Sequence, residues 1–208
     1  MRVLVLGAGG HARPVIEALR ASGAEPAGLL DDRDGPPVLG VPRLGRLDTL
    51  AAQRRAGLAA AVVAIGDNAL RQRLGAACRE AGFALPVLLH PAAVVSPSAR
   101  LAEGVQVMAR AVVGPEAVLA ALVLLNTGAI VEHECRLAEA VHIGPGAVLC
   151  GGVRVGALAL VGAGAVVRPG IGIGAESLVA TGAAVGAEVP AGRRAGGVPA
   201  RLIDMPAG

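Results

Sequence analysis

Residues 95–190 decide the fold of this chain, because they repeat with a period of six. Cut every six residues from Val95, they read VSPSAR, LAEGVQ, VMARAV, VGPEAV, LAALVL, LNTGAI, VEHECR, LAEAVH, IGPGAV, LCGGVR, VGALAL, VGAGAV, VRPGIG, IGAESL, VATGAA and VGAEVP. All sixteen hexapeptides begin with Val, Leu or Ile, and the fifth residue is always Ala, Val, Ile, Cys or Ser. This period predicts a parallel β-helix of about five triangular coils, with the first and fifth residues pointing inward.

The first part of the chain has a different pattern, in which strands alternate with helices. Apolar runs bounded by Gly or polar residues predict strands over 2–7, 27–32, 60–66 and 85–89. Helical spacing predicts helices over 11–22, 47–57 and 67–82. Alternation of this kind indicates a small parallel sheet of Rossmann type. We therefore expect an α/β Rossmann-like domain over 1–90, followed by a β-helix domain with a C-terminal tail over 91–208.

Composition narrows the classes of function. The net charge is only +3, and one Phe is the sole aromatic residue, so neither the electrostatics nor the base stacking of a nucleic-acid binder is present. The cysteines are three in number, without CxxC spacing, which favours free thiols in a cytoplasmic protein. No long apolar run free of turn residues occurs, so we expect no membrane span.

The repeat is chemically silent except in residues 125–142, LNTGAIVEHECRLAEAVH, where two histidines and several polar groups gather. His133 is the third residue of its hexapeptide, a position that usually faces outward, and Glu134 follows it. A carboxylate beside a histidine can fix its tautomer and raise its basicity, so this pair favours a general base over plain surface. A zinc site is the alternative, but Cys135 is at the inward fifth position and adjacent strand residues face opposite sides.

Three segments of the N-terminal half end predicted strands and open turns or helices. GAGGHA (7–12) can hold phosphates through backbone N–H groups and a helix N-terminus. Asp31-Asp32 follows the second strand, where an acidic residue often meets a ribose hydroxyl, and AIGDN (64–68) ends the third. The carboxyl ends of parallel strands are where open α/β sheets bind ligands, which favours a nucleotide-like ligand over simple turns and caps.

With these residues in view, the whole chain resembles the bacterial sugar acetyltransferases related to sialic acid O-acetyltransferase. That group includes nucleotide-sugar N-acetyltransferases of the bacillosamine and perosamine type. The resemblance runs through GAGGH, LLDD, AIGDNALR, LLHPAAVVSPSA, NTGAIVEHEC and GGVPARLI. It implies a left-handed β-helix, a homotrimer with active sites between neighbouring copies, and transfer of acetyl from acetyl-CoA to the amino group of a nucleotide-linked amino sugar.

The resemblance also implies roles for particular residues. His133 is implied to be the catalytic base and Glu134 its orienting carboxylate. The residues implied to bind acetyl-CoA are His142, Ala163, Gly164 and Thr181, with the segment 197–201 near its nucleotide. The residues implied to bind the nucleotide sugar are Gly9, Gly10, His11, Asp31, Asp32, Gly66 and Asn126. Two alternatives stay open: O-acetylation of sialic-acid-like sugars, and a non-catalytic hexapeptide-repeat scaffold.

Overall fold

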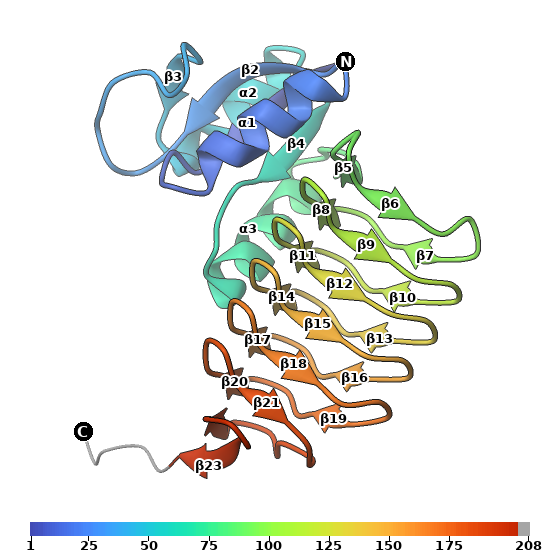
Figure 1. Cartoon of the computed structure of the whole chain (residues 1–208). Helices are drawn as coiled ribbons and strands as arrows, with labels where there is room; N and C mark the ends of the chain where they lie inside the picture. Colours follow the sequence, from blue (N-terminus) through green and yellow to red (C-terminus); the bar gives the residue numbers. More distant parts are fainter. Residues whose placement is uncertain (204–208) are drawn as a thin grey trace.

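The N-terminal unit is a four-stranded parallel sheet between helices, in a computed structural model that describes residues 1–203 (Figure 1). The end of the predicted C-terminal tail, residues 204–208, lies outside the described residues. The strand order is β3-β2-β1-β4. Its elements are β1 (Arg2–Leu6), α1 (Ala12–Ala21), β2 (Glu25–Leu30), β3 (Arg43–Gly45), the 3-10 helix η1 (Leu47–Thr49), α2 (Leu50–Arg55), β4 (Ala60–Val63) and α3 (Asn68–Glu80).

Alternate residues of β1 supply two cores, because successive strand side chains point to opposite faces of the sheet. Val3 and Val5 pack with α1 on one face, in a cluster that also includes Leu124 of the following β-helix. Leu4 and Leu6 pack with α2 and α3 on the other face, together with Leu122. Both cores therefore continue into the β-helix, which docks the N-terminal unit on it.

The rest of the described chain is a left-handed parallel β-helix whose short strands form three sheets. The eight-stranded sheet contains β5 (Leu88–Leu89), β8 (Gln106–Val107), β11 (Leu124–Leu125), β14 (His142–Ile143), β17 (Leu160–Val161), β20 (Leu178–Val179), β22 (Arg194–Gly196) and the antiparallel β23 (Arg201–Ile203). The six-stranded sheet contains β6 (Val94–Val95), β9 (Val112–Val113), β12 (Ile130–Val131), β15 (Val148–Leu149), β18 (Val166–Val167) and β21 (Ala184–Val185). The five-stranded sheet contains β7 (Arg100–Leu101), β10 (Val118–Leu119), β13 (Arg136–Leu137), β16 (Arg154–Val155) and β19 (Gly172–Ile173).

The hexapeptide pattern predicts this interior correctly, and the predicted fold class is confirmed. The buried cluster inside the coils consists almost wholly of first-position and fifth-position residues of the repeat, such as Val131 and Cys135. Each coil lies in register on the next, as where Ile130 pairs with Val148 eighteen residues later. The turns between strands place a residue with positive φ at the fourth position, which is Gly128 in one turn and Glu134 in the next.

The predicted strand over 85–89 was assigned to the wrong sheet. Leu88 and Leu89 form β5 of the β-helix and pair with β8, while the fourth strand of the N-terminal sheet is β3. Ala84 makes only an isolated bridge to Ala60 of β4. The physical reason is that Leu89 already follows the six-residue period, so the coil begins one hexapeptide before Val95. The predicted helix over 47–57 is also shorter, as η1 and α2.

None of the helices within residues 1–203 has the length and apolar character needed to cross a bilayer.

Candidate active site

His133 lies in the turn between β12 and β13, at a corner of the β-helix. Its side chain is 57% exposed, and its Nδ1 lies 2.9 Å from Oε2 of Glu134. Glu134 is the fourth residue of its hexapeptide and has a φ of 58°. That left-handed conformation leaves the carboxylate beside the imidazole of the preceding residue. The pair is local, so it forms without help from any distant part of the chain.

Gly151 of the next coil lies directly below the His133 ring, eighteen residues along the chain. A Cβ at this position would contact Cε1 and Nε2 of the imidazole and would lie 3.1 Å from Cδ2. With Nδ1 hydrogen-bonded to a carboxylate, the neutral ring carries its proton on Nδ1 and leaves Nε2 as the acceptor. The absence of a side chain at Gly151 thus keeps the basic nitrogen uncovered.

A second polar cluster lies where the N-terminal unit meets the eight-stranded sheet. His142 opens β14, half-buried, and its Nε2 lies 3.3 Å from Nδ2 of Asn126. His11, from the turn before α1, lies with its Nε2 3.2 Å from Oε1 of Gln106. Gln106 is itself 1% exposed and donates to the carbonyl of Val63 at 2.8 Å. This junction therefore collects side chains from both units around the carboxyl ends of the N-terminal strands.

The junction keeps its two histidines neutral. Burial, the charge of Arg71 and the neighbouring His11 together lower the pKa of His142 to about 4, against a contact with the backbone of Gly66 that raises it. Burial also lowers the pKa of His11, opposed by its hydrogen bond with Gln106. A neutral imidazole can donate from one nitrogen and accept at the other, which suits hydrogen bonding to a neutral carbonyl or hydroxyl group.

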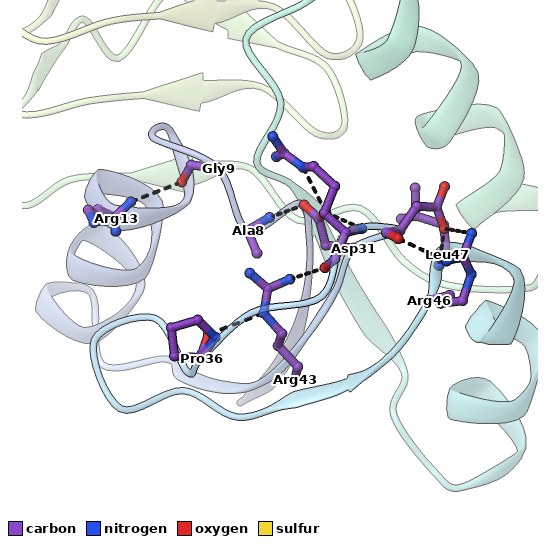
Figure 2. A network of polar contacts seen from close by, with 10 residues as sticks. Ala8, Gly9, Arg13, Asp31, Pro36, Arg43, Arg46 and Leu47 are labelled. Carbon is purple, nitrogen blue, oxygen red and sulfur yellow. Dashed lines mark hydrogen bonds and ion pairs between the residues drawn. The ribbon is translucent and has the colours of Figure 1, made fainter.

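Asp31 and Asp32 hold the N-terminal loops together, and Figure 2 shows the contact of Asp31 with Ala8. Asp31 is 9% exposed and accepts a hydrogen bond from the backbone N–H of Ala8 at 2.7 Å. It also forms an ion pair with Arg33, whose Nε lies 3.2 Å from the carboxylate. Burial alone would raise the pKa of Asp31, but the hydrogen bonds from Arg33 and Ala8 outweigh it and lower the pKa. Asp32 is exposed and accepts from the backbone of Leu47 at 3.1 Å. The carboxylate of Asp31 thus fixes the glycine-rich loop, in which Gly10 is exposed and Gly9 half-buried.

Ala163, Gly164 and Thr181 lie on the corner between the eight- and six-stranded sheets, on successive coils. The backbone N–H of Gly182 donates to Ala163 at 2.8 Å, which stacks the two turns. Asn126 lies on the same corner higher up. On the outer face of the eight-stranded sheet, toward the corner that it shares with the five-stranded sheet, a cavity of about 430 Å³ runs from the loop after β4 down to the end of the sheet. Its lining includes Gly66, Asn68, Leu160, Leu178 and Arg194.

The structure brings six of the thirteen predicted site residues into two places. His11, Gly66, Asn126 and His142 belong to the junction, whereas the pair of His133 and Glu134 lies on another corner of the β-helix, across the six-stranded sheet. No contact joins the two places within the described chain. Three residues that sequence reasoning did not single out also matter here: Gln106, Arg71 and Gly151. Gln106 carried a signal, as a polar residue at the sixth position of a repeat that is usually aliphatic there.

Cys135 does not offer a nucleophile, and residues 1–203 hold no cluster of metal ligands. Cys135 is buried inside the coil, its Sγ lies 3.2 Å from the carbonyl of Cys150, and burial raises its pKa to about 11. A thiol with such a pKa carries almost no thiolate at neutral pH. Within residues 1–203, no three side chains of His, Cys, Asp or Glu lie close enough to hold a metal ion together.

Comparisons with known proteins give consistent matches. Residues 2–76 match the family described as the PglD N-terminal domain. A histidine-to-alanine variant of GDP-perosamine N-acetyltransferase from Caulobacter crescentus, solved with CoA and GDP-perosamine, is 46% identical, with a TM-score of 0.97 over 99% of this chain and 98% of that chain. PerB from the same organism, also with CoA and GDP-perosamine, is 47% identical, with a TM-score of 0.94 over 98% of each chain.

The acetyltransferase domain of PglB from Neisseria gonorrhoeae, solved with acetyl coenzyme A, is 38% identical. Its TM-score is 0.93, over 97% of this chain and 98% of that chain. A search of curated protein sequences gave no significant match.

Proposed function

Because this chain belongs to the family of bacterial nucleotide-sugar acetyltransferases, we propose that it transfers acetyl from acetyl-CoA to the amino group of a GDP-linked amino sugar. Relatives that are 46% and 47% identical over nearly their whole length were solved with CoA and GDP-perosamine, which favours GDP over other nucleotides. The observation that carries the proposal is the pair of His133 and Glu134, whose imidazole keeps an uncovered Nε2 beside Gly151.

His133 acts as the general base in this reaction. Its Nε2 takes the proton from the sugar amine as nitrogen attacks the thioester carbonyl, and the resulting imidazolium returns that proton to the leaving CoA sulfur. Glu134 holds the ring by Nδ1 and stabilises the imidazolium, as a carboxylate does in other His-based catalysts. A positioned base supplies about 10²–10⁴-fold in rate, and the alignment of amine and thioester about 7–11 kcal/mol of barrier reduction. The transfer is direct, since burial raises the pKa of the Cys78 and Cys135 thiols and leaves almost no thiolate on either.

The N-terminal unit binds the nucleotide sugar, and the β-helix domain binds the acyl donor. Gly9, Gly10 and the N-terminus of α1 face the phosphates, where backbone N–H groups favour anions. The remaining sugar-nucleotide contacts that we propose are His11, Asp31, Asp32, Gly66 and Asn126. Asp31 contributes mainly by bracing the loop, because both of its oxygens already accept hydrogen bonds.

His142 hydrogen-bonds the thioester end of acetyl-CoA, and Ala163, Gly164 and Thr181 line the path of its arm along the corner below. The outer face of the eight-stranded sheet adjoins this corner, and a cavity of about 430 Å³ on that face, toward its far corner, has an apolar wall formed by Leu160 and Leu178. Arg194 at its lower end supplies a positive charge for a phosphate. The residues present therefore fit the acyl donor, whose thioester supplies the activated acetyl group.

The active enzyme is a homotrimer in which His133 of one copy meets the junction of the next. Two observations support this arrangement. His133 and His142 lie on different corners of one chain, so a single copy does not bring base and acyl donor together. An outward apolar column also runs down the six-stranded sheet between these corners, with Val94 63% and Val166 43% exposed. The members of this column are Val94, Val112, Ile130, Val148, Val166 and Ala184.

A cytoplasmic location completes the proposal, since acetyl-CoA is an intracellular donor and all three cysteines are free.

The experiment measures thiol release from acetyl-CoA with a chromogenic thiol reagent. The acceptors are GDP- and UDP-linked amino sugars, each tested with wild-type protein and with His133→Ala. We expect release that requires the GDP-linked acceptor, with kcat lower by about 10²–10⁴-fold in the variant and an unchanged sedimentation coefficient. Equal turnover in the variant would remove His133 as the base. No thiol release with any amino sugar, together with acetylation of a sugar hydroxyl, would show that the acceptor is a hydroxyl group. Failure to bind CoA would favour a non-catalytic scaffold.

A further inference from the structure

Arg71 of α3 is a fully buried cation that has no carboxylate partner within residues 1–203. Its side chain is 0% exposed, although it lies at the junction of the two units. The nearest acidic residue, Asp67, caps α3 by accepting from the backbone N–H of Leu70 at 2.7 Å. An ionised group away from water is costly unless hydrogen bonds replace its hydration. A buried apolar side chain at this position would avoid that cost, so the hydrogen bonds of the guanidinium are the feature that calls for an explanation.

All five N–H groups of the Arg71 guanidinium have acceptors. The acceptor distances lie between 2.8 and 3.2 Å. The acceptors are the backbone carbonyls of Ile65, Gly66, Leu122 and Ala140 and Oδ1 of Asn68. A guanidinium offers five donors in a rigid planar fork, so this set saturates it and fixes the relative positions of its acceptors.

These acceptors come from both units and from the two segments that carry candidate site residues. Ile65 and Gly66 form the loop after β4, in the N-terminal unit. Ala140 directly precedes Val141 and His142, in the β-helix. One planar group thus ties the backbone of the nucleotide-sugar loop to the backbone that carries the histidine assigned to the acyl donor.

We propose that Arg71 is a positioning residue that sets the loop at Gly66 against the strand that carries His142. It contacts neither substrate. Its effect on the reaction comes from the distance and orientation that it imposes between the two binding segments. This inference rests on the proposed function for the identity of the two ligands, but the contacts on which it stands are those of the chain itself.

Arg71 also acts on His142 through its charge. The groups that face His142 are Arg71, His11, the amide of Asn126 and the backbone of Gly66. Burial and then the charge of Arg71 lower the pKa of His142, so the cation helps to keep the imidazole neutral. Geometry and charge can be separated, because Lys retains the charge at residue 71 but has only three donors and no planar fork.

The experiment compares Arg71→Met and Arg71→Lys with wild-type protein in two assays on the full chain. The first is kcat/KM for the nucleotide sugar. We expect a loss of about 10²-fold in both variants, the effect of a shift of about 1 Å at a distance from the chemistry. The second is the NMR titration of His142, identified by its loss in His142→Gln. We expect its midpoint to rise in Arg71→Met and to stay near the wild-type value in Arg71→Lys.

Arg79→Met is the matched control, because Arg79 lies on the same helix and bridges the same two units. It pairs with the side chains of Glu103 at 2.6 Å and Glu139 at 3.6 Å, and all three side chains are partly exposed. We expect it to leave kcat/KM and the His142 midpoint unchanged.

Folded Arg71 variants with kcat/KM within about threefold of wild type and an unmoved His142 midpoint would overturn the proposal. Asn68→Ala, which removes the one side-chain acceptor, keeps the test decisive if Arg71→Met does not fold. It should lower kcat/KM in the same direction, and wild-type kinetics in both Asn68→Ala and Arg71→Lys would refute the positioning role. A wild-type protein that turns over no nucleotide sugar would instead refute the proposed function, and the His142 titration would still test Arg71.

Discussion

Replacement of Gly151 by Ala should separate activity from stability. The added methyl group would contact Cε1 and Nε2 of His133, the edge of the ring that must accept a proton. The imidazole is exposed and can swing away, but any swing displaces Nε2 or breaks the 2.9 Å contact with Glu134. A displacement of about 1 Å at a reacting group costs about 10²-fold in rate, or about 2.7 kcal/mol of transition-state stabilisation. We therefore expect kcat to fall by about 10²-fold.

The same substitution should not weaken the fold. Gly151 is not among the glycines with positive φ, so Ala can adopt its backbone conformation without strain. At such a position Gly→Ala stabilises a protein by about 0.4–1 kcal/mol, because the unfolded chain loses freedom. For a chain of this size we expect the melting temperature to stay constant or to rise by about 1–4 °C.

The assay is thiol release at saturating acetyl-CoA, with a thermal melt of the same samples. Gly186→Ala is the control, because Gly186 also has no positive φ and its Cβ would meet only the flexible side chain of Arg168, at 3.5 Å. Wild-type kcat in Gly151→Ala would refute the placement of Nε2 as the reacting nitrogen. Equal losses of activity in both variants would mean that any added methyl group on the β-helix lowers activity, whether or not it contacts His133.

Three further predictions concern the base, the junction and the coil. Glu134→Gln should lower kcat, by up to about 10⁴-fold if the amide selects the wrong tautomer of His133, with little change in a urea melt, since an exposed pair contributes at most about 1 kcal/mol. His142 has a folded pKa of about 4 against an ordinary 6.5, so the unfolded chain binds more protons between these values. The free energy of unfolding should therefore fall as pH drops through that window, by at most about 1.4 kcal/mol per pH unit from this residue, and urea melts of His142→Gln should lose that slope. Gly162→Ala should lower the free energy of unfolding by about 1–3 kcal/mol, because its Cβ would lie 2.6 Å from the backbone nitrogen of Thr181 in the next coil, and a urea melt like wild type would contradict this.

Much of the fold could be predicted because the β-helix is periodic. Each coil contacts mainly its neighbours, so the same positions are buried in every repeat. Val131 and Cys135, the first and fifth residues of their hexapeptide, show which positions these are. The strand over 85–89 was misplaced because an apolar run does not say which sheet it joins. Leu88 could pair with β4 or with β8, and only the register of the coil, in which its N–H donates to Val105 at 2.9 Å, decides between them.

The candidate site divides in the same way. The partnership of His133 with Glu134 could be predicted, because adjacent residues in one turn meet whatever the rest of the chain does. The junction could not, since Gln106 meets His11 across 95 residues and Arg71 reaches Ala140 across 69. No local pattern in α3 distinguishes Arg71 from the other arginines of that helix.

The sequence by itself determined the kind of protein: its period of six specifies the coils, and its motifs specify the family and the turn that we propose to be catalytic. Only the tertiary structure decided which loop faces which strand, that Asp31 braces the glycine-rich loop, and that Arg71 joins the two units. The physical reason is the separation along the chain over which each interaction acts. Hydrophobic periodicity and turn conformation act between near neighbours along the chain, whereas the saturation of a buried guanidinium depends on carbonyl groups that only the packing of two units brings together.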